Sequence, residues 1–251
     1  DECLFNPSPI ERVVPHDGGF VRLPALSGVA VARLTAVEGT VTAADMVLDN
    51  GRVRAVFNKS GEIEALRFDG CDVPLKGPAG QLHLYPDQPH LFEAWEKLRQ
   101  SYSLGRQVNG SAKVTYGANF IRFDRTLSEK SKAVVTYSLM PGCGQLQIAF
   151  EVDWQDPQTM VKFIVPTHYA GKQARYGAAF TSVMRSQLPE DLSDEAQFEV
   201  PASRYAVVSD DGERDGLFIA TEGLFGFTCR EGALATTLLT SPRITGEGDG
   251  Y

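Results

Sequence analysis

The chain has 251 residues, of which 43% are hydrophobic and 22% charged; this length accommodates one large all-β domain or two small ones, and the composition excludes a disordered chain. The net charge of −8 argues against nucleic acid and anionic membranes as partners, because no basic cluster denser than Arg99 with Arg106 interrupts the acidic background. No apolar run approaches the ~18 residues that a membrane-spanning helix needs.

The first 40 residues differ in pattern from the rest of the chain. Proline and glycine break up residues 6–9 and 15–19, and short strands are predicted at 12–14 and 29–34. We therefore expect a small β unit, or lead-in strands, over 1–40 and a large domain over 41–251. The chain starts without methionine and without a signal-peptide pattern, which indicates a processed chain or a piece of a longer protein.

Alternation of apolar and polar residues dominates the region that follows. Residues 52–57 and 62–68 alternate at every second position and flank the Asn- and Gly-containing connection 58–61. This pattern is typical of a hairpin with one buried and one wet face. Residues 41–48 form a third strand candidate, and the sequence predicts a three-stranded meander.

Further strand candidates continue to the C-terminus at close spacing. Residues 145–153 (QLQIAFEVD) alternate without a break after the turn sequence 141–144. The remaining candidates lie at 118–127, 132–140, 161–165, 205–209, 216–221 and 233–239. So many short strands predict a mostly β protein, a large antiparallel β-sandwich or barrel.

A single helix is predicted after residue 86. Asp87 is a candidate N-cap, and Phe92, Trp95, Leu98 and Tyr102 are spaced to share one apolar face. Residues 187–196 are acidic and polar, which predicts a loop or a single helical turn.

The cysteines and histidines give weak signals of chemistry. The four cysteines, Cys3, Cys71, Cys143 and Cys229, are scattered and lack the paired spacing of a zinc site. This scatter favours free thiols over disulfides, and it slightly favours a cytoplasmic location. His83, His90 and His168 could serve a zinc site or an aldose-epimerase site, although surface or hydrogen-bonded histidines are more common. No nucleophile elbow, phosphate-binding loop or dinucleotide fingerprint is present in the sequence.

Several segments, taken in order, resemble the C-terminal half of the class II α-mannosidases, glycoside hydrolase family 38. The similar segments are 4–8 (LFNPS), 22–28 (RLPALSG), 48–63 (LDNGRVRAVFNKSGEI), 84–96 (LYPDQPHLFEAWE), 198–205 (FEVPASRY), 224–227 (LFGF) and 238–242 (LLTSP). The chain departs from the family pattern at Glu96, Tyr205 and Thr240, where Asp, Trp and Arg are expected. The arginine position lies near the substrate in family members, so a direct substrate contact at Thr240 is in doubt.

The resemblance implies a fold, and it implies that the catalytic residues lie outside this chain. The fold is the large galactose-mutarotase-like sandwich, the supersandwich. The family's zinc and aspartate nucleophile belong to an N-terminal catalytic domain, and no segment here matches its motifs. We therefore expect no catalytic residue, no metal ligand and no cofactor in this chain, with zinc in the missing catalytic domain of the parent.

Three functions remain open at this point. The first is a non-catalytic domain that braces the catalytic domain of the same parent and borders the sugar cleft, contacting mannose-containing glycans. Its candidate carbohydrate-binding or domain-docking residues are Tyr85, Phe92, Trp95 and Glu96, although packing is the more frequent role of such aromatic clusters. The second is an aldose epimerase, for which His83, His168 and Glu93 are the available groups. The third is a free-standing carbohydrate-binding module.

Overall fold

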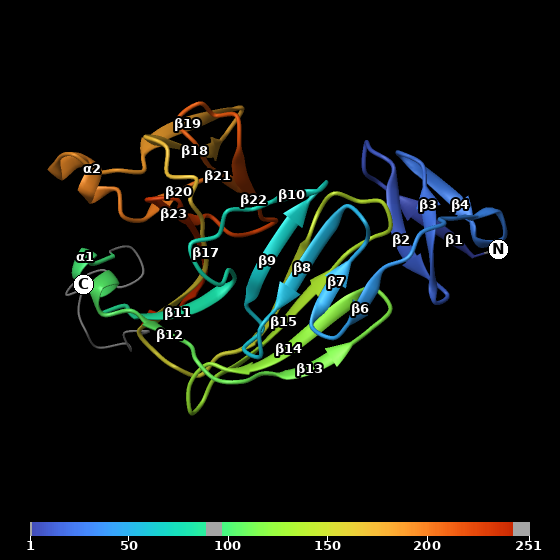
Figure 1. The fold of residues 1–251 in the computed structure, drawn as a ribbon, viewed down its shortest axis with the longest axis horizontal. Coiled ribbons are helices and arrows are strands. Elements are labelled where there is room, and N and C mark those ends of the chain that lie inside the picture. The colour runs from blue at the N-terminus through green and yellow to red at the C-terminus, as the bar shows by residue number, and fades with distance from the viewer. Residues whose placement is uncertain (1, 89–96, 243–251) are drawn as a thin grey trace, which may run out of the picture.

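The computed structural model describes residues 2–88 and 97–242, and these form a mostly β protein built from antiparallel sheets (Figure 1). Two short helices accompany the strands, α1 (Arg99–Ser103) and α2 (Leu192–Ala196). Asp191 caps α2 by accepting a hydrogen bond from the Asp194 amide at 2.8 Å. Neither helix in the described part of the chain is long and apolar enough to cross a membrane.

The N-terminal residues form two small sheets of their own. One pairs β1 (Cys3–Asn6) with β4 (Ser27–Ala30), and the other has the order β2 (Arg12–His16), β3 (Gly19–Leu23) and β5 (Thr35–Ala36). A 3₁₀ turn at Val31–Arg33 ends the strand predicted at 29–34, so that prediction was wrong beyond Ala30. The division of the chain near residue 40 stays a prediction.

The first sandwich consists of two facing sheets. One has the order β10 (Cys71–Asp72), β9 (Ile63–Phe68), β8 (Val53–Phe57), β7 (Val47–Asp49) and β6 (Thr42–Ala44). The other has the order β13 (Lys113–Tyr116), β14 (Phe120–Thr126), β15 (Lys132–Ser138) and β16 (Gln147–Asp153). The ring of Phe57 lies 5.2 Å from that of Phe123 and 4.7 Å from that of Tyr137, which places the core between the sheets.

The predicted meander has one more turn than expected. Residues 41–48 are a hairpin of β6 and β7, because Asp45 and Met46 adopt φ values of 49° and 62°. A two-residue loop with both residues at positive φ matches the twist of an antiparallel hairpin. Methionine is not a usual residue for that position, so the sequence carried no signal for this turn.

The second sandwich contains the remaining strands. Its larger sheet has the order β12 (Arg106–Gln107), β11 (Gln81–Pro86), β17 (Thr159–Pro166), β24 (Ala233–Thr240), β23 (Gly226–Arg230) and β20 (Val200–Pro201). The smaller has the order β19 (Thr181–Ser186), β18 (Gln173–Ala178), β21 (Tyr205–Ser209) and β22 (Gly216–Ala220).

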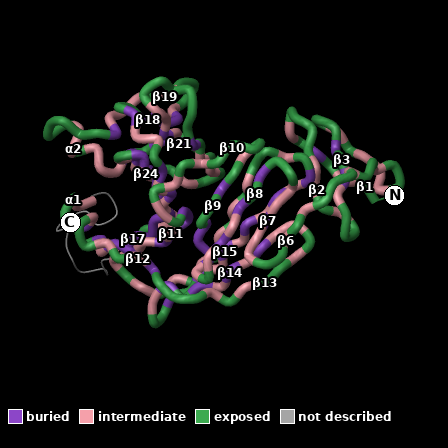
Figure 2. Tube along the Cα trace, viewed as in Figure 1, coloured by how far each residue is buried: buried purple, intermediate pink, exposed green. Residues whose placement is uncertain are grey.

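One apolar core runs through both sandwiches. Figure 2 shows buried positions along the strands and exposed positions in the connections. The rings of Phe150 on β16 and Phe163 on β17 lie 5.3 Å apart and join the two halves. Because the buried side chains form a single cluster, we expect the sandwiches to unfold together.

The buried thiol of Cys229 provides a first testable prediction. Burial raises the pKa of Cys229 to about 12, whereas Cys71 is exposed on the edge strand β10. Since the thiolate is the reactive form, we expect a thiol reagent at pH 8 to modify Cys71 in the folded protein and Cys229 only after unfolding. Mass mapping of the labelled peptides measures this; rapid labelling of Cys229 in the native chain would contradict the packing of β23.

Candidate functional site

Segments that lie far apart in the sequence meet at one end of the six-stranded sheet. The amide of Asp87 donates to the Gln158 carbonyl at 2.8 Å, and the amide of Gln158 donates to the Ser241 carbonyl at 2.6 Å. The Ser241 hydroxyl in turn bonds the carbonyls of Asp156 and Thr159. Two of the segments that carry the family resemblance, 84–96 and 238–242, are therefore linked by hydrogen bonds through Gln158.

A buried charge cluster lies in the same sheet. The ammonium of Lys162 on β17 is 1% exposed and donates to the carboxylate of Glu199 and, at 2.8 Å, to the hydroxyl of Thr228. Glu199 also accepts from Thr237 at 2.6 Å and from the Tyr102 hydroxyl at 2.8 Å. The Thr228 hydroxyl donates to Glu199 as well, so four hydrogen-bonding groups from separate segments converge on one carboxylate.

The electrostatics of this cluster follow from its burial and its pairing. Burial alone would favour a neutral Glu199, but the charge of Lys162 and the hydrogen bonds outweigh it and hold the pKa of Glu199 below its usual value. Burial lowers the pKa of Lys162, and raises the pKa of the Tyr102 hydroxyl. Tyr102 is therefore a neutral donor to an ionised carboxylate.

Tyr85 lies within this arrangement and is buried. Its ring is 5.2 Å from that of Tyr102 and 6.1 Å from that of His83. Gly105 allows this packing, because a Cβ atom there would lie 2.1 Å from the Tyr85 ring. The ring of Tyr102 also packs edge-on against Phe198 at 5.0 Å.

The segment between Asp87 and Tyr102 is fixed at both ends. Asp87 is buried and its carboxylate accepts from the ammonium of Lys97 at 2.5 Å, while Tyr102 is bound to Glu199. Asp87 and Gln88 are not helical, and the Asp87 side chain pairs with Lys97; among the described residues helix begins at Arg99, in α1, and the middle of the predicted helix, 89–96, lies outside them. Three predicted site residues, Phe92, Trp95 and Glu96, lie outside the described residues, and with Tyr85 they remain predictions.

Among the residues described, the hydrogen bonds of the histidines do not reach a carboxylate. His83 bonds the side-chain amide oxygen of Gln81 at 3.0 Å, and burial lowers the pKa of His83. His168 is exposed, and the other groups proposed for an epimerase, His90 and Glu93, lie outside the described residues. Within 2–88 and 97–242, no three His, Cys, Asp or Glu side chains gather in a way that would hold a metal ion.

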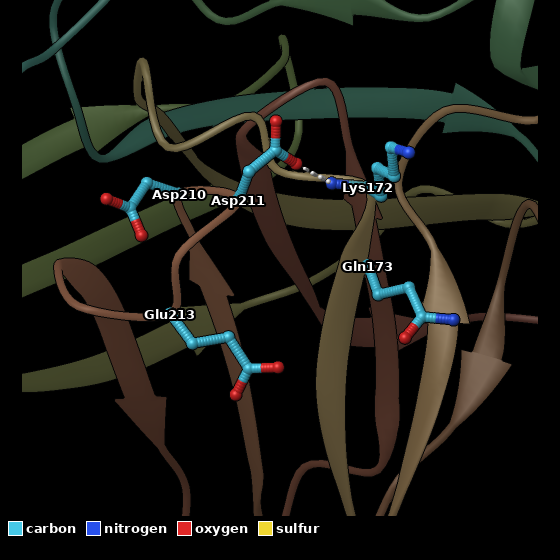
Figure 3. Close-up of a pocket in the computed structure, with 5 residues that line it drawn as sticks. All are labelled: Lys172, Gln173, Asp210, Asp211 and Glu213. Atoms are coloured by element: carbon cyan, nitrogen blue, oxygen red, sulfur yellow. Dashed lines mark hydrogen bonds between the residues drawn. The ribbon is translucent and has the colours of Figure 1, made fainter.

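Two open hollows lie on the smaller sheet of the second sandwich. One, of about 500 Å³, is lined by Lys172, Gln173, Asp210, Asp211 and Glu213, and the Lys172 amide donates to the Asp211 carboxylate across it (Figure 3). The other, of about 270 Å³, also includes Glu213 and reaches Phe218. Sequence reasoning found neither, because their residues combine the predicted strands 205–209 and 216–221 and the turn between them with residues 172–184, for which no strand was predicted.

Lys162 is the residue of the buried cluster that sequence reasoning missed. Lys162 lies within the apolar run 161–165, where it is the single charged residue, and its side chain is buried. A lysine in such a run was a usable signal, since a buried lysine requires a partner. Glu199 lay in a quoted motif but was not singled out.

Comparison with known proteins places this fold in a family. Residues 48–244 match the model of the glycosyl hydrolases family 38 C-terminal domain. The chain is 26% identical to human alpha-mannosidase 2C1 over 215 residues, covering 82% of this chain and 20% of that protein. Against alpha-mannosidase G of Dictyostelium discoideum it is 21% identical over 230 residues, covering 83% of this chain and 20% of that protein.

Solved structures agree in fold. An alpha-mannosidase from Enterococcus faecalis V583 superposes with a TM-score of 0.68 at 13% identity, over 96% of this chain and 33% of that one. A second family 38 glycosyl hydrolase from Enterococcus faecalis gives 0.65 at 12% identity, over 93% and 34%. The chain spans about a fifth of the length of the curated relatives and a third of the solved chains. By this match over most of its length, the chain belongs to the glycosyl hydrolase family 38 C-terminal domain family.

Proposed function

We propose that this chain is a non-catalytic β-sandwich region of a larger α-mannosidase, where it braces the catalytic domain and borders the sugar cleft. The observation that carries the proposal is the segment between Asp87 and Tyr102, which carries Phe92, Trp95 and Glu96. Its two ends are fixed by a buried ion pair and by a buried carboxylate network. A segment whose two ends are fixed loses less conformational entropy on binding a partner than a free loop does.

The cost of this arrangement supports a role beyond folding. Charges removed from water are expensive, and an apolar sheet would be as stable without them. Lys162 and Glu199 lie beneath the helix that follows the segment, and the Lys162 ammonium is 5.5 Å from the ring centre of Tyr102. The pair therefore fixes the position of Tyr102, and through it the end of the segment proposed to border the sugar.

An apolar patch on the N-terminal unit is the proposed bracing surface. Phe5, Ile10 and Leu26 are between 66% and 75% exposed. The buried side chain of Asn6 holds their segments together, donating to the carbonyls of Ile10 and of Leu23 and Pro24 and accepting from the Ser8 amide. Exposed apolar side chains held in a fixed arrangement are typical of an interaction surface.

The reaction chemistry is assigned to the catalytic domain of the parent. The described residues offer no donor cluster that fits zinc, and the family's zinc is expected in that domain. We therefore expect the purified chain to release no product from a chromogenic α-mannoside, with or without added zinc. Clear zinc-dependent release by the chain alone would overturn this assignment.

The bracing role is tested by supplying the catalytic region of the same polypeptide as a separate fragment. Co-purification with this chain and restored mannosidase activity are the expected results. Ile10→Glu should abolish both, because it buries an unpaired carboxylate in the proposed interface. Leu192→Glu on α2, an apolar position that is 81% exposed against 66% for Ile10 and lies at the opposite end of the molecule, is the control (Figure 1). Full complementation by Ile10→Glu would exclude the patch.

A further inference from the structure

The outward face of the sheet β19-β18-β21-β22 combines aromatic rings with polar groups. Along β18, Ala174 and Tyr176 point into the core, so Gln173, Arg175 and Gly177 lie on the opposite face. The register places Val207 opposite Arg175 and Phe218 opposite Val207, so these residues share that face. The ring of Tyr205 lies 5.5 Å from that of Phe218.

A glycine sets the position of the Tyr205 ring. A Cβ atom at Gly177 would lie 2.7 Å from the ring and 2.2 Å from the Ser203 carbonyl oxygen, so no larger residue fits. The ring therefore lies down against the backbone of β18 and leaves its other side outward. Phe218 beside it is 58% exposed. Together the two side chains form an aromatic platform on the sheet.

Hydrogen-bonding groups border the platform in two adjoining hollows. The hollow of about 270 Å³ is lined by Arg175, Ser209, Glu213 and Phe218 among others, and meets the larger hollow of Figure 3 at Glu213. Arg175 donates to Glu213 at 2.9 Å and to the Ser182 hydroxyl at 3.1 Å. The guanidinium and the carboxylate are thus held in place and keep further donor and acceptor capacity.

The charge of these hollows limits what they would bind. Their lining carries the carboxylates of Asp210, Asp211, Glu213 and Asp215 against the cations of Lys172, Arg175 and Arg214. Arg175 is paired with Glu213, and the excess of carboxylates over cations offers no net attraction to a polyanion. Flat rings flanked by fixed donors and acceptors suit a ligand that has apolar ring faces and a rim of hydroxyl groups.

We propose that this platform, with Tyr205 and Phe218 at its centre, binds neutral oligosaccharides. The faces of the sugar rings stack on the two aromatic side chains, and the sugar hydroxyls form hydrogen bonds with Arg175, Glu213 and Ser209. This is a second saccharide-binding surface, carried by the second sandwich itself, and it does not depend on the bracing role proposed above. The strand β18 extends about 13 Å from Gln173 to Gly177, a length that suits a short oligosaccharide rather than a single sugar.

The test titrates the ¹⁵N-labelled 251-residue chain with α-mannotetraose and, in parallel, with a sulfated heparin tetrasaccharide. We expect saturable amide shifts in residues 205–218 with the neutral sugar and none with the sulfated one. Phe218→Ala should weaken binding about tenfold or more, as loss of one stacking contact predicts. Phe5→Ala, an exposed phenylalanine at the other end of the molecule, should leave binding unchanged.

Specific outcomes overturn the proposal. It falls if no saturable shifts occur, if the shifts lie outside this sheet, or if Phe218→Ala binds as tightly as the original chain. Self-association of the chain that Phe218→Ala abolishes, without sugar binding, would identify the platform as a contact between protein copies instead. Arg175→Met keeps the rings and removes the donors, so retained binding by that variant would contradict the assigned hydroxyl contacts.

Discussion

Replacement of Glu199 by alanine is expected to lower the free energy of unfolding by about 3–5 kcal/mol. The reason is that Lys162 is buried, and Glu199 is the carboxylate that compensates its charge. Without Glu199, the Lys162 ammonium keeps its hydrogen bond to the Thr228 hydroxyl and its contact with the Tyr102 ring, but neither partner is an anion that compensates its charge. Chemical denaturation followed by circular dichroism measures the change.

A double substitution distinguishes the loss of one charge of the pair from the loss of the whole ion pair. Lys162→Met combined with Glu199→Leu removes both charges and keeps apolar volume, so most of the lost stability should return. Tyr102→Phe is the milder control, since it removes one hydrogen bond to an ionised group and should cost about 1.5–3 kcal/mol. A Glu199→Ala chain within 1 kcal/mol of the original would show that the ion pair is not buried in solution.

The same pair predicts a pH dependence. The pKa of Glu199 is held below its usual value of 4.5, so its ionised form contributes stability that is fully present above that pH. This contribution is lost as the pH falls through the lowered pKa of the folded state. The stability difference between the original chain and Glu199→Ala should therefore be constant near neutral pH and shrink below about pH 4.5. A difference that grows in acid would reverse the assigned protonation.

The sequence predicted best those strands that have one wet face. Residues 52–57, 62–68 and 145–153 alternate, and the structure has β8, β9 and β16 there. Residues 173–186 gave no signal, although they form β18 and β19. Their glycine and alanines have low strand propensity, and the strands are stabilised by pairing and by the Tyr205 ring on Gly177. Such distant partners cannot be read from a local pattern.

The sequence predicted which segments form the candidate site, but it did not predict which residues contact one another there. Residues 84–96 and 198–205 were singled out by resemblance, and the structure links Tyr102, just beyond the first segment, to Glu199 in the second. The helix predicted from Asp87 falls mostly outside the described residues, and the apolar spacing at 92, 95, 98 and 102 does not report the ion pair between Asp87 and Lys97. Lys162 bonds a carboxylate 37 positions away, which periodicity cannot register.

Replacement of Phe123 by alanine is expected to cost about 3–5 kcal/mol of stability, as large cavities in packed cores do. Phe123 is fully buried between the sheets of the first sandwich, with the Tyr137 ring 5.9 Å away and Gly61 directly against its own ring. Gly61 has no side chain that could move into the space left by the ring, so the cavity is expected to stay open. Denaturant midpoints should fall with an unchanged m-value.

The location of the effect matters as much as its size. Phe5→Ala removes the same side chain from an exposed position and should change stability by less than about 0.5 kcal/mol. Cys229 lies in the second sandwich but in the same core cluster as Phe123. If the core unfolds as one unit, Phe123→Ala must expose the Cys229 thiol at the same denaturant concentration at which the first sandwich unfolds. Protection of Cys229 that outlasts the first sandwich would instead mean that the two sandwiches are separate folding units, each stable without the other.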